Sequence, residues 1–362
     1  MADEDVRKRA VTKFQEFAQI LDMTVSVVPR ACVLGGGSFG TSLALVLAAK
    51  GYAVSVWVRC QEQVRTVNES RENLKYLPGV KIPQSILWTN DVEGAVQNAE
   101  LVLFAIPTQF LRSFAQSNRS TMPVGVPLVL CAKGIELSSL QLPYDVLRDE
   151  LPGKYSKFIC VLSGPSFAKE IAANHPTSVV VASCEPSVAE TVQMQLTCTA
   201  ANFRVYTVSD VMGAEIAGAV KNVLAIAAGA VSGLGFGSNT RAALICRGLV
   251  EMTRLAEKMG SDSSCMKGLA GIGDLLLTCS SELSRNFTVG RRLAAGETLG
   301  DILKSSSSVA EGVATTKALH ELRQKLGVEM PLCEEVYKVL YEGKDVRCVL
   351  DDLQSRVPGS EY

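Results

Sequence analysis

Lys221 and Asn222 lie inside an almost wholly apolar stretch, AVKNVLAIAAGAV, which covers residues 219–231. The surrounding aliphatic side chains predict a buried helix, in which the charge of a lysine is poorly solvated. Such a lysine must be ion-paired, deprotonated or used in chemistry, unless its long side chain reaches solvent. The only histidines, His175 and His320, are remote from other candidate metal ligands in the sequence. We therefore expect no metal site and no histidine base, and another residue must transfer protons.

Gly35, Gly37 and Gly40 have the G-x-G-x-x-G spacing. A short apolar strand precedes them, an Ala/Leu helix follows, and a second strand is predicted over Ala53–Val58. In this setting the first glycine permits a tight turn, the second lets backbone approach a pyrophosphate, and the third lets helix and strand pack closely. The N-terminus of the helix offers N–H groups and partial positive charge to phosphates. We predict dinucleotide binding; a tight turn without a ligand is the alternative.

The end of the second strand departs from the usual NAD pattern. An acid normally binds the ribose 2′-OH at this position, but the sequence has Trp57, Val58 and Arg59, with Glu62 three residues later. Arg59 could stack on adenine or bind a 2′-phosphate, so the choice between NAD and NADP stays open. An exposed loop arginine is the other interpretation.

Further apolar strands end in residues that would face a ligand crevice. The stretch Ala99–Pro107 leads into a helix carrying Phe110, which packs either on the nucleotide or in the helix core. The stretch Val126–Glu136 places Lys133 directly after a strand. Because the carboxyl ends of parallel strands face the crevice, a lysine there can hold or polarise an anionic substrate.

Three more strand-like stretches complete a first domain. Phe158–Glu170 carries the turn residues Ser163 to Ser166, and Thr177–Ser183 and Asn202–Val208 follow. After Asp210 the β-branched strands give way to Ala/Gly/Leu helices, so a domain boundary is expected there.

The second half predicts two long buried helices around a glycine-rich bend, with small residues that permit tight helix packing. Asp274 lies in an apolar run beside glycines, and Ser284, Arg285 and Asn286 begin a basic helix. A helix N-terminus with a guanidinium suits a phosphate. An ordinary serine cap with a solvated arginine is the alternative.

The composition limits the classes of protein to which this chain can belong. With 362 residues the chain should form about two domains, and a net charge of -1 gives no reason to expect nucleic acid or an anionic membrane as partner. Eleven scattered cysteines without a C-x-x-C pair indicate reduced thiols. The sequence contains no uninterrupted apolar run of about 18 residues, so no transmembrane helix is predicted. The acidic start, Asp3 to Asp5, and the final residues SEY match no targeting signal. A cytoplasmic location is expected.

Taken together, the spaced motifs resemble the NAD(P)-dependent glycerol-3-phosphate dehydrogenases from about Ala31 to about Lys344. The matching blocks are GGGSFGTSLA, FAIPTQFLR, KGIE, SGPSFAKE, AVKNVLAIAAG, GLAGIGDLLLTC, SRNFTVG and AEGVAT. The resemblance implies an α/β fold, with a Rossmann-type doubly wound sheet at residues 30–209 and an all-helical substrate-binding domain at 210–362. Residues 1–29 lie outside it, and we expect a helical extension there.

The implied reaction is the reversible reduction of dihydroxyacetone phosphate to sn-glycerol 3-phosphate with NADH, NADP remaining possible. It links glycolysis to glycerol and glycerolipid metabolism, and a homodimer is usual in the family. The resemblance implies that Lys221 is the proton donor and acceptor, that Lys133 binds substrate, and that Asp274 is their partner acid. Arg285 and Asn286 are the implied phosphate clamp.

The remaining implied positions are of two kinds. Further substrate-binding residues are Gly164, Ser166, Asn222, Thr278 and Ser284. Cofactor-binding residues, with the three motif glycines Gly35, Gly37 and Gly40 and with Arg59, are Ser38, Phe39, Phe110, Lys133, Ala168, Arg285, Val309 and Glu311.

These roles agree with the chemistry of ketone reduction. Hydride addition develops an alkoxide, which needs a proton from a nearby acid, and a desolvated lysine has its pKa lowered towards the working pH. Lys133 would lower the pKa of Lys221 further, whereas Asp274 would oppose that.

Two alternatives remain. A β-hydroxyacid or 6-phosphogluconate type of dehydrogenase also uses a lysine and an asparagine, but spaces them about a helical turn apart, whereas Lys221 and Asn222 are adjacent. The other alternative is a non-catalytic NAD sensor, which would have no need for all four of Lys221, Lys133, Asp274 and Arg285.

Overall fold

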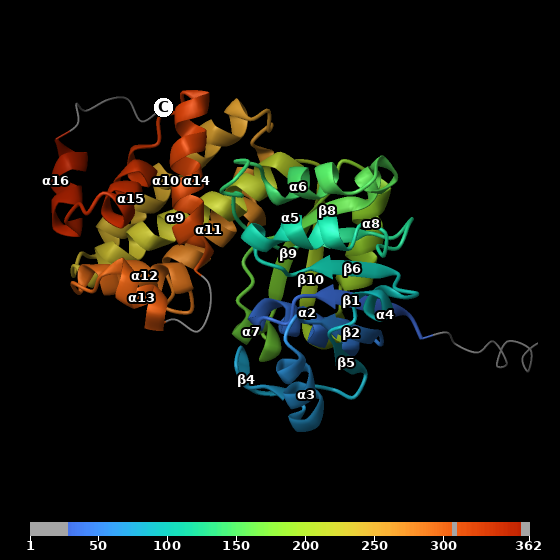
Figure 1. The fold of residues 1–362 in the computed structure, drawn as a ribbon. Coiled ribbons are helices and arrows are strands. Elements are labelled where there is room, and N and C mark those ends of the chain that lie inside the picture. Colours follow the sequence, from blue (N-terminus) through green and yellow to red (C-terminus); the bar gives the residue numbers. More distant parts are fainter. Residues whose placement is uncertain (1–27, 306–309, 356–362) are drawn as a thin grey trace, which may run out of the picture.

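An eight-stranded sheet forms the framework of the N-terminal half (Figure 1). The structure, a computed structural model, describes residues 28–305 and 310–355. The strand order is β10-β9-β8-β7-β6-β1-β2-β5. Their bounds are β1 Arg30–Leu34, β2 Ala53–Trp57, β5 Ile86–Thr89, β6 Leu101–Phe104, β7 Leu128–Leu130, β8 Ile159–Ser163, β9 Thr177–Ala182 and β10 Phe203–Val208.

The connectivity creates a switch point between β1 and β6. The chain runs from β1 outwards to β2 and β5, and then returns to β6 on the other side of β1. All neighbouring strands of the sheet are parallel except β8 and β9. In an open sheet of this kind the ligand crevice lies beyond the carboxyl ends of the strands at the switch point. The carboxyl ends of β1 and β6 are therefore the expected cofactor site.

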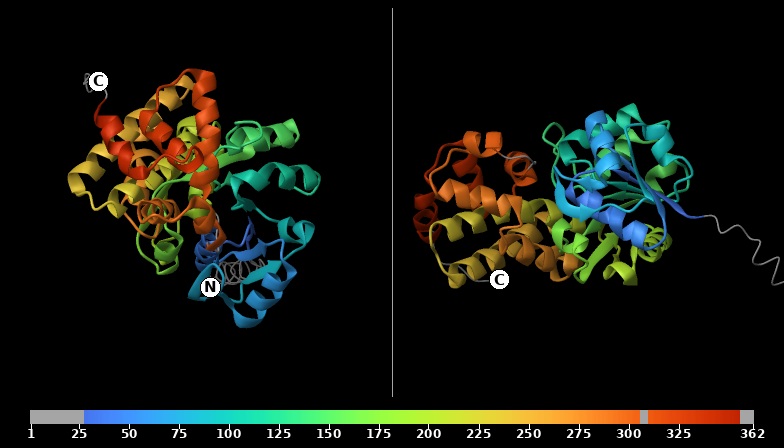
Figure 2. Two further views of the ribbon diagram at one scale, coloured as in Figure 1. Left: turned by 60° about the vertical axis from the view of Figure 1, so that its left-hand side comes forward. Right: turned by 90° about the horizontal axis from the view of Figure 1, so that it is seen from below.

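Helices cover both faces of the sheet, as Figure 2 shows. They are α2 Ser38–Ala49, α3 Gln61–Ser70, α4 Val92–Val96, α5 Thr108–Ser117, α6 Pro143–Glu150, α7 Ala168–Ala172 and α8 Pro186–Leu196, with 3-10 turns at Gly153–Phe158 and Thr199–Ala201. Strands β6, β7 and β8 are buried along their whole length. Continuous apolar runs are what a sheet covered on both faces requires.

Alternate residues of each central strand belong to different apolar cores. On β1, Val33 packs into one core together with α2 and α8, whereas Leu34 packs into the other. The core that contains Leu34 continues into the helices of the second half, where it includes Val220 and Leu224. One face of the sheet and the helical half therefore share a single apolar core.

The structure differs from the sequence-based expectation in two respects. Strands β9 and β10 run antiparallel to β8, so the sheet is mixed. The edge strand β5 and a small hairpin, β3 Glu72–Asn73 with β4 Leu77–Lys81, were not predicted. A chain can reverse into β9 because the short helix α7 and its turn bring it back beside β8 without a full crossover.

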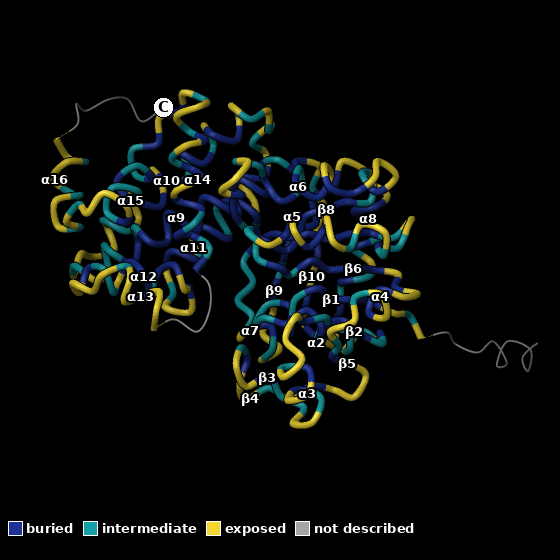
Figure 3. The backbone as a smooth tube through the Cα atoms, viewed as in Figure 1, coloured by how far each residue is buried: buried dark blue, intermediate teal, exposed yellow. Residues whose placement is uncertain are grey.

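Helix α9, Val211–Gly233, is the centre of the helical half, and Figure 3 shows it as buried. Around it lie α10 Ser238–Lys258, α11 Asp274–Cys279, α12 Arg285–Ala294, α13 Leu299–Ser305, α14 Glu311–Leu326, α15 Pro331–Tyr341 and α16 Val349–Gln354. Short turns lie at Ser264–Lys267, Leu269–Gly273 and Val346–Cys348. The Asp210 side chain caps α9 by accepting a hydrogen bond from the backbone N–H of Gly213.

By length and composition α9 could cross a membrane, but 72% of its apolar window is buried inside the protein. It is thus the core helix of this half. Glycines permit its close contact with α12: a Cβ on Gly229 would lie 1.9 Å from the Phe287 carbonyl oxygen, and one on Gly290 would lie 1.8 Å from that of Ile226. The two predicted long helices are α9 and α10, but only α9 is buried along most of its length. Helix α10 buries one face, and the tightest small-residue contact of α9 is with α12. The predicted helix over residues 1–29 lies outside the described residues, apart from Val28 and Pro29, which precede β1.

Candidate active site

The three motif glycines form the turn between β1 and α2, and the space around each of them differs. Gly35 has a φ of +115°, and a Cβ there would lie 2.5 Å from the Ala105 carbonyl oxygen at the end of β6. A Cβ on Gly40 would lie 1.9 Å from the Gly35 carbonyl oxygen. Gly37, in contrast, faces open space. The turn therefore leaves room for a ligand at Gly37, beside the free N–H groups that begin α2.

A second centre is formed by two lysines that share one carboxylate. The Nζ of Lys221, on α9, donates to Oδ1 of Asp274 at 2.6 Å and to the hydroxyl of Thr278 at 2.9 Å. The Nζ of Lys133, which follows β7, donates to Oδ2 of Asp274 at 2.7 Å and to the Gly164 carbonyl at 3.3 Å. The two halves of the chain thus meet at Asp274, which is 1% exposed.

Burial and charge set the protonation of this centre. Burial lowers the pKa of Lys221 to about 8; Asp274 acts to raise it and Lys133 lowers it further. Burial alone would raise the pKa of Asp274, but the two lysines hold it below its ordinary value. The centre therefore carries one carboxylate and a lysine that exchanges its proton near neutral pH.

Two asparagines connect this centre to α12 and α14. Asn222 donates to the Lys133 carbonyl at 3.3 Å and accepts from Nδ2 of Asn286 at 2.9 Å. The Oδ1 of Asn286 accepts from the Gly312 N–H at 3.0 Å. The amide of Asn286, expected to bind phosphate with Arg285, is thus partly engaged within the protein, with one N–H of Nδ2 left to donate.

The N-terminus of α12 carries the expected serine cap. The Ser284 hydroxyl accepts from the Phe287 N–H at 3.3 Å, and Ser284 is buried. Arg285, the first residue of the helix, is exposed and lines the cavity described next. The helix terminus and the guanidinium therefore converge on one place, as an anion site needs.

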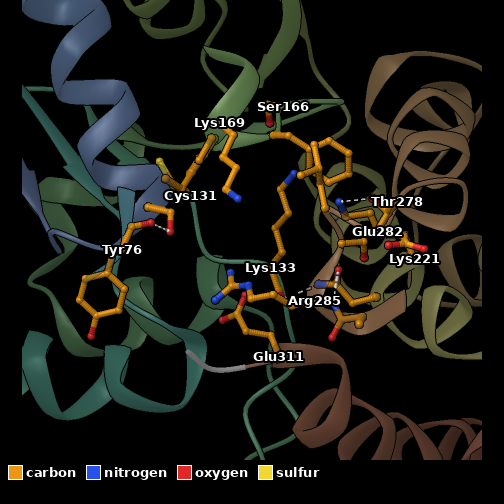
Figure 4. Close-up of a pocket in the computed structure, with 18 of the residues that line it drawn as sticks. Tyr76, Cys131, Lys133, Ser166, Lys169, Lys221, Thr278, Glu282, Arg285 and Glu311 are labelled. Carbon is orange, nitrogen blue, oxygen red and sulfur yellow. Dashed lines mark hydrogen bonds between the residues drawn. The ribbon is translucent and has the colours of Figure 1, made fainter. Parts of the chain in front are cut away.

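A cavity of about 480 Å³ lies between the two halves and joins these groups (Figure 4). Its lining among the described residues is Ser38, Phe39, Lys75, Tyr76, Pro78, Cys131, Lys133, Ser166, Phe167, Ala168, Lys169, Lys221, Asn222, Thr278, Glu282, Leu283, Ser284, Arg285, Asn286 and Glu311. The structure thus brings most of the expected substrate and cofactor residues to one cavity, with Asp274 and Gly164 bonded to its lysines.

Glu311 links the cavity to α5. Its Oε1 accepts from the Thr108 N–H at 3.1 Å, at the start of that helix. Burial raises the pKa of the Glu311 carboxyl, whereas the Thr108 N–H and the charge of Arg285 act in the opposite direction. Glu311 therefore ties the first turn of α5 to the first turn of α14 at the cavity wall.

Six expected cofactor residues are not part of this lining: the motif glycines Gly35, Gly37 and Gly40, which form the adjoining turn, and three others. Arg59 is exposed just beyond β2, and Phe110 is 51% exposed on α5. Val309 lies outside the described residues. The structure describes all eleven cysteines as free thiols. Among the described residues, no group of three or more His, Cys, Asp or Glu side chains could hold a metal.

The sequence-based prediction did not include several residues of the cavity wall, namely Cys131, Phe167, Glu282, Leu283 and the residues of two further segments. Lys75, Tyr76 and Pro78 come from the β3–β4 hairpin, which is fastened to α2 by a hydrogen bond of 2.6 Å from the Ser38 hydroxyl to the Tyr76 carbonyl. Lys169 is the residue directly after Ala168. The only available signal for Lys169 was this adjacency to an implied cofactor position.

Comparison with known proteins agrees with this geometry. Residues 30–189 match the family described as NAD-dependent glycerol-3-phosphate dehydrogenase N-terminus, and residues 210–351 match the corresponding C-terminus. The glycosomal glycerol-3-phosphate dehydrogenase [NAD(+)] of Leishmania mexicana is 46% identical over 331 residues, 90% of each chain. The glycerol-3-phosphate dehydrogenase [NAD(P)+] of Leptospira biflexa is 46% identical and covers 90% of this chain and 97% of its own.

A solved structure shows the same fold. The glycerol-3-phosphate dehydrogenase of Coxiella burnetii superimposes with a TM-score of 0.86 at 35% identity, covering 91% of this chain and 99% of its own. With both halves matched and the dinucleotide turn facing the lysine–aspartate centre across one cavity, the chain belongs to the NAD-dependent glycerol-3-phosphate dehydrogenase family.

Proposed function

We propose that this chain catalyses the reversible NADH-dependent reduction of dihydroxyacetone phosphate to sn-glycerol 3-phosphate. The observation that carries the proposal is the buried Lys221, bonded to Asp274 and Thr278 on the wall of the cavity that reaches the dinucleotide turn. The open space at Gly37 and the left-handed backbone of Gly35 fit a dinucleotide at that turn. NADH, when bound, supplies the hydride.

Lys221 is the proposed proton donor for the oxygen of the reduced carbonyl. Its pKa of about 8 lets it give up a proton near neutral pH and recover it in the reverse direction. Asp274 holds the ammonium at 2.6 Å and compensates its charge in the buried site. Thr278 accepts a second hydrogen bond from Lys221, so the ammonium has a fixed direction and one N–H left for substrate.

The substrate phosphate is proposed to bind at the N-terminus of α12. Arg285 offers a guanidinium there, and the capped helix terminus adds its own positive potential. Asn286, Ser166 and the region of Gly164 complete the proposed substrate wall. Lys133, which shares Asp274 with Lys221, is proposed to polarise the substrate. Ser38, Phe39, Ala168 and Glu311 form the proposed cofactor wall.

The first experiment is an NADH oxidation assay with dihydroxyacetone phosphate, repeated with NADPH. Consumption of NADH alone supports the reaction and an adenine-side contact for Arg59. Comparable use of NADPH supports Arg59 as a 2′-phosphate contact. A folded protein that binds NADH but oxidises neither cofactor would contradict the proposed reaction and favour a hydroxyacid dehydrogenase or a sensor.

Two variants test the assigned roles. Lys221→Ala should abolish turnover while NADH still binds, and near-normal turnover would remove Lys221 from the mechanism. Arg285→Ala should raise the KM for dihydroxyacetone phosphate sharply. Arg204→Ala, an exposed arginine on β10 outside the cavity lining, is the matched control and should leave KM unchanged.

We further propose a homodimer and a cytoplasmic location. The family resemblance supports the first. The second is proposed for this chain, whereas the Leishmania relative is named as glycosomal. Light scattering of the purified protein tests the dimer, and microscopy of the tagged chain in its own cell tests the location.

A further inference from the structure

Lys169 is a cavity-lining cation to which the family resemblance gives no role. It is the second residue of α7, directly after Ala168, and its side chain is exposed to the cavity. Figure 4 shows its side chain pointing into the open cavity, on the side away from Lys221 and Thr278. Within the described residues, its ammonium has no hydrogen-bond or ion-pair partner.

The other cations of the cavity wall have protein groups close by. Lys133 and Lys221 are both bonded to Asp274. Arg285 interacts with the charge of Glu311. Lys75 lies over the ring of Tyr76, 5.1 Å from its centroid. Lys169 is therefore the cavity cation most available to a ligand.

The position of α7 identifies which part of a ligand Lys169 can reach. Helix α7 packs against α2 and against β4 of the hairpin. The hairpin is in turn bonded to Ser38, the first residue of α2. Lys169 thus stands on the same wall as Ser38 and Phe39, where the N–H groups at the start of α2 face the cavity. Arg285 and the N-terminus of α12 belong to the other half of the chain.

We propose that the Lys169 ammonium binds the diphosphate of the dinucleotide cofactor, opposite the N-terminus of α2. This inference rests on the proposed cofactor site at that helix. The lining has five cationic side chains and two carboxylates among the described residues, so it attracts an anion. The helix terminus offers N–H donors on one side of the diphosphate, and Lys169 provides a full positive charge on the other.

The test compares Lys169→Met with the wild-type protein by titrating NADH and following its fluorescence, without substrate. We expect the Kd for NADH to rise about tenfold, the usual size of one lost charge-assisted contact. The Kd for ADP-ribose, which keeps the diphosphate but lacks nicotinamide, should rise equally. The NADH affinity of the variant should also depend less on salt than that of the wild type, because one ionic contact is missing.

Two further variants control the experiment. Lys169→Arg keeps the charge and should restore most of the affinity. Lys81→Met removes an exposed lysine of β4 that is outside the cavity lining and should leave the Kd unchanged. Since Lys169 has no protein partner, its loss should not alter the Tm.

Several outcomes would overturn the proposal. One is an unchanged Kd for NADH and ADP-ribose in Lys169→Met. Another is a raised KM for dihydroxyacetone phosphate with an unchanged NADH Kd, which would place Lys169 on the substrate phosphate. If the wild type binds NADH but does not oxidise it with dihydroxyacetone phosphate, the proposed reaction fails, and the NADH titration still decides the role of Lys169. Failure of the wild type to bind NADH would overturn both the proposed reaction and the proposed role of Lys169.

Discussion

Asp274 gives one carboxylate oxygen to each of two lysines, and this division controls the proton chemistry of the site. A lysine buried among apolar side chains loses the hydration of its charged form, which lowers its pKa. Asp274 restores part of that stabilisation to Lys221, while the nearby charge of Lys133 removes part of it. The balance leaves the pKa of Lys221 at about 8, within the range where enzymes work.

This balance predicts opposite pH profiles for the two directions of the reaction. With Lys221 as the proposed proton donor, reduction of the ketone needs its ammonium form, so kcat/KM should fall as pH rises through about 8. Oxidation of the alcohol needs the neutral amine, so its kcat/KM should rise over the same range. Initial rates in both directions, from pH 6 to about 10, measure this. Parallel profiles would contradict the assignment.

The substitution Asp274→Asn should move the midpoints of both pH profiles in a defined direction. The carboxylate raises the pKa of Lys221, so its removal leaves two facing ammonium groups and should shift both profiles to lower pH. Asp351→Asn, on the exposed surface of α16, is the control and should keep the wild-type midpoint. A shift to higher pH in Asp274→Asn would show that Asp274 does not hold the charged lysine.

Some site residues could be predicted from the sequence and others could not. Lys221 and Asp274 could be predicted as site residues because burying a charged side chain in an apolar run costs free energy. Lys75 and Lys169 lie in short exposed segments where a lysine is ordinary, so only the fold shows that they face one cavity. The hydrogen bonds of Asn286 to Asn222 and Gly312 join three helices that no sequence spacing connects.

At the scale of elements, two glycines of the β1–α2 turn differ in their expected roles. Gly40 is needed for packing within the turn, whereas Gly37 is proposed to leave room for a ligand. Gly40→Ala would place a Cβ 1.9 Å from the Gly35 carbonyl, so it should destabilise the fold by roughly 1–3 kcal/mol. Gly37 has a φ of -76° and open space around it, so Gly37→Ala should leave the Tm unchanged. Its methyl group would instead occupy the space proposed for the diphosphate and should weaken NADH binding.

Thermal denaturation and NADH titration of both variants measure these effects. Gly300→Ala, on exposed α13 with no atom closer than 3.8 Å to the added Cβ, is the control for a tolerated glycine substitution. If Gly37→Ala bound NADH as the wild type does, the proposed position of the diphosphate would be wrong.

The contact between α9 and α12 positions the end of α12 at which we propose that the substrate phosphate binds. Gly290→Ala would push its Cβ to 1.8 Å from the Ile226 carbonyl, and the helices would have to separate. Because Ser284, Arg285 and Asn286 begin α12, their displacement should raise the KM for dihydroxyacetone phosphate as well as lower the Tm. The NADH Kd, measured by titration, should change less. A lower Tm with an unchanged KM would show that the position of α12 does not orient the proposed phosphate clamp.

The sequence indicated most elements but not all of their directions. The strands around β1, β6 and β7 were predictable because they are continuously apolar, and α9 and α10 because they are long. The antiparallel β9 looks the same in sequence as a parallel strand would. Strand β5 is short, with burial that alternates along it, and its partner β2 determines its place. The domain division at residue 210 stays a prediction about independent folding units.

At the scale of the whole molecule, the two halves share an apolar core and are joined by polar contacts. Asn222 and Asp274 bind Lys133 across the cavity. On another side of α9, Oε1 of Glu215 accepts from the Tyr144 N–H at 2.9 Å, in the first turn of α6. These contacts fix the helical half against the sheet, and the core between them excludes water from Glu215, which is 5% exposed.

The burial of Glu215 should make the stability of the whole molecule depend on pH. Burial raises the pKa of its carboxyl to about 8, more than the Tyr144 N–H lowers it, and Asp145 adds to the increase. In the unfolded chain the carboxyl ionises near its ordinary value of 4.5. Between pH 4.5 and about 8 the folded protein therefore binds one proton more than the unfolded chain. The stability that Glu215 contributes is complete below pH 4.5 and is lost as pH rises through about 8.

Glu215→Gln keeps the hydrogen-bond acceptor and removes the titration. The free energy of unfolding of this variant should fall less than that of the wild type between pH 5 and about 8, by on the order of a few kcal/mol. Urea denaturation at several pH values measures the difference, and Glu190→Gln, on the exposed face of α8, should follow the wild type. A Glu215→Gln slope equal to that of the wild type would mean that Glu215 is ionised in the fold. The helix dipole of α6, rather than desolvation, would then govern the contact between the two halves.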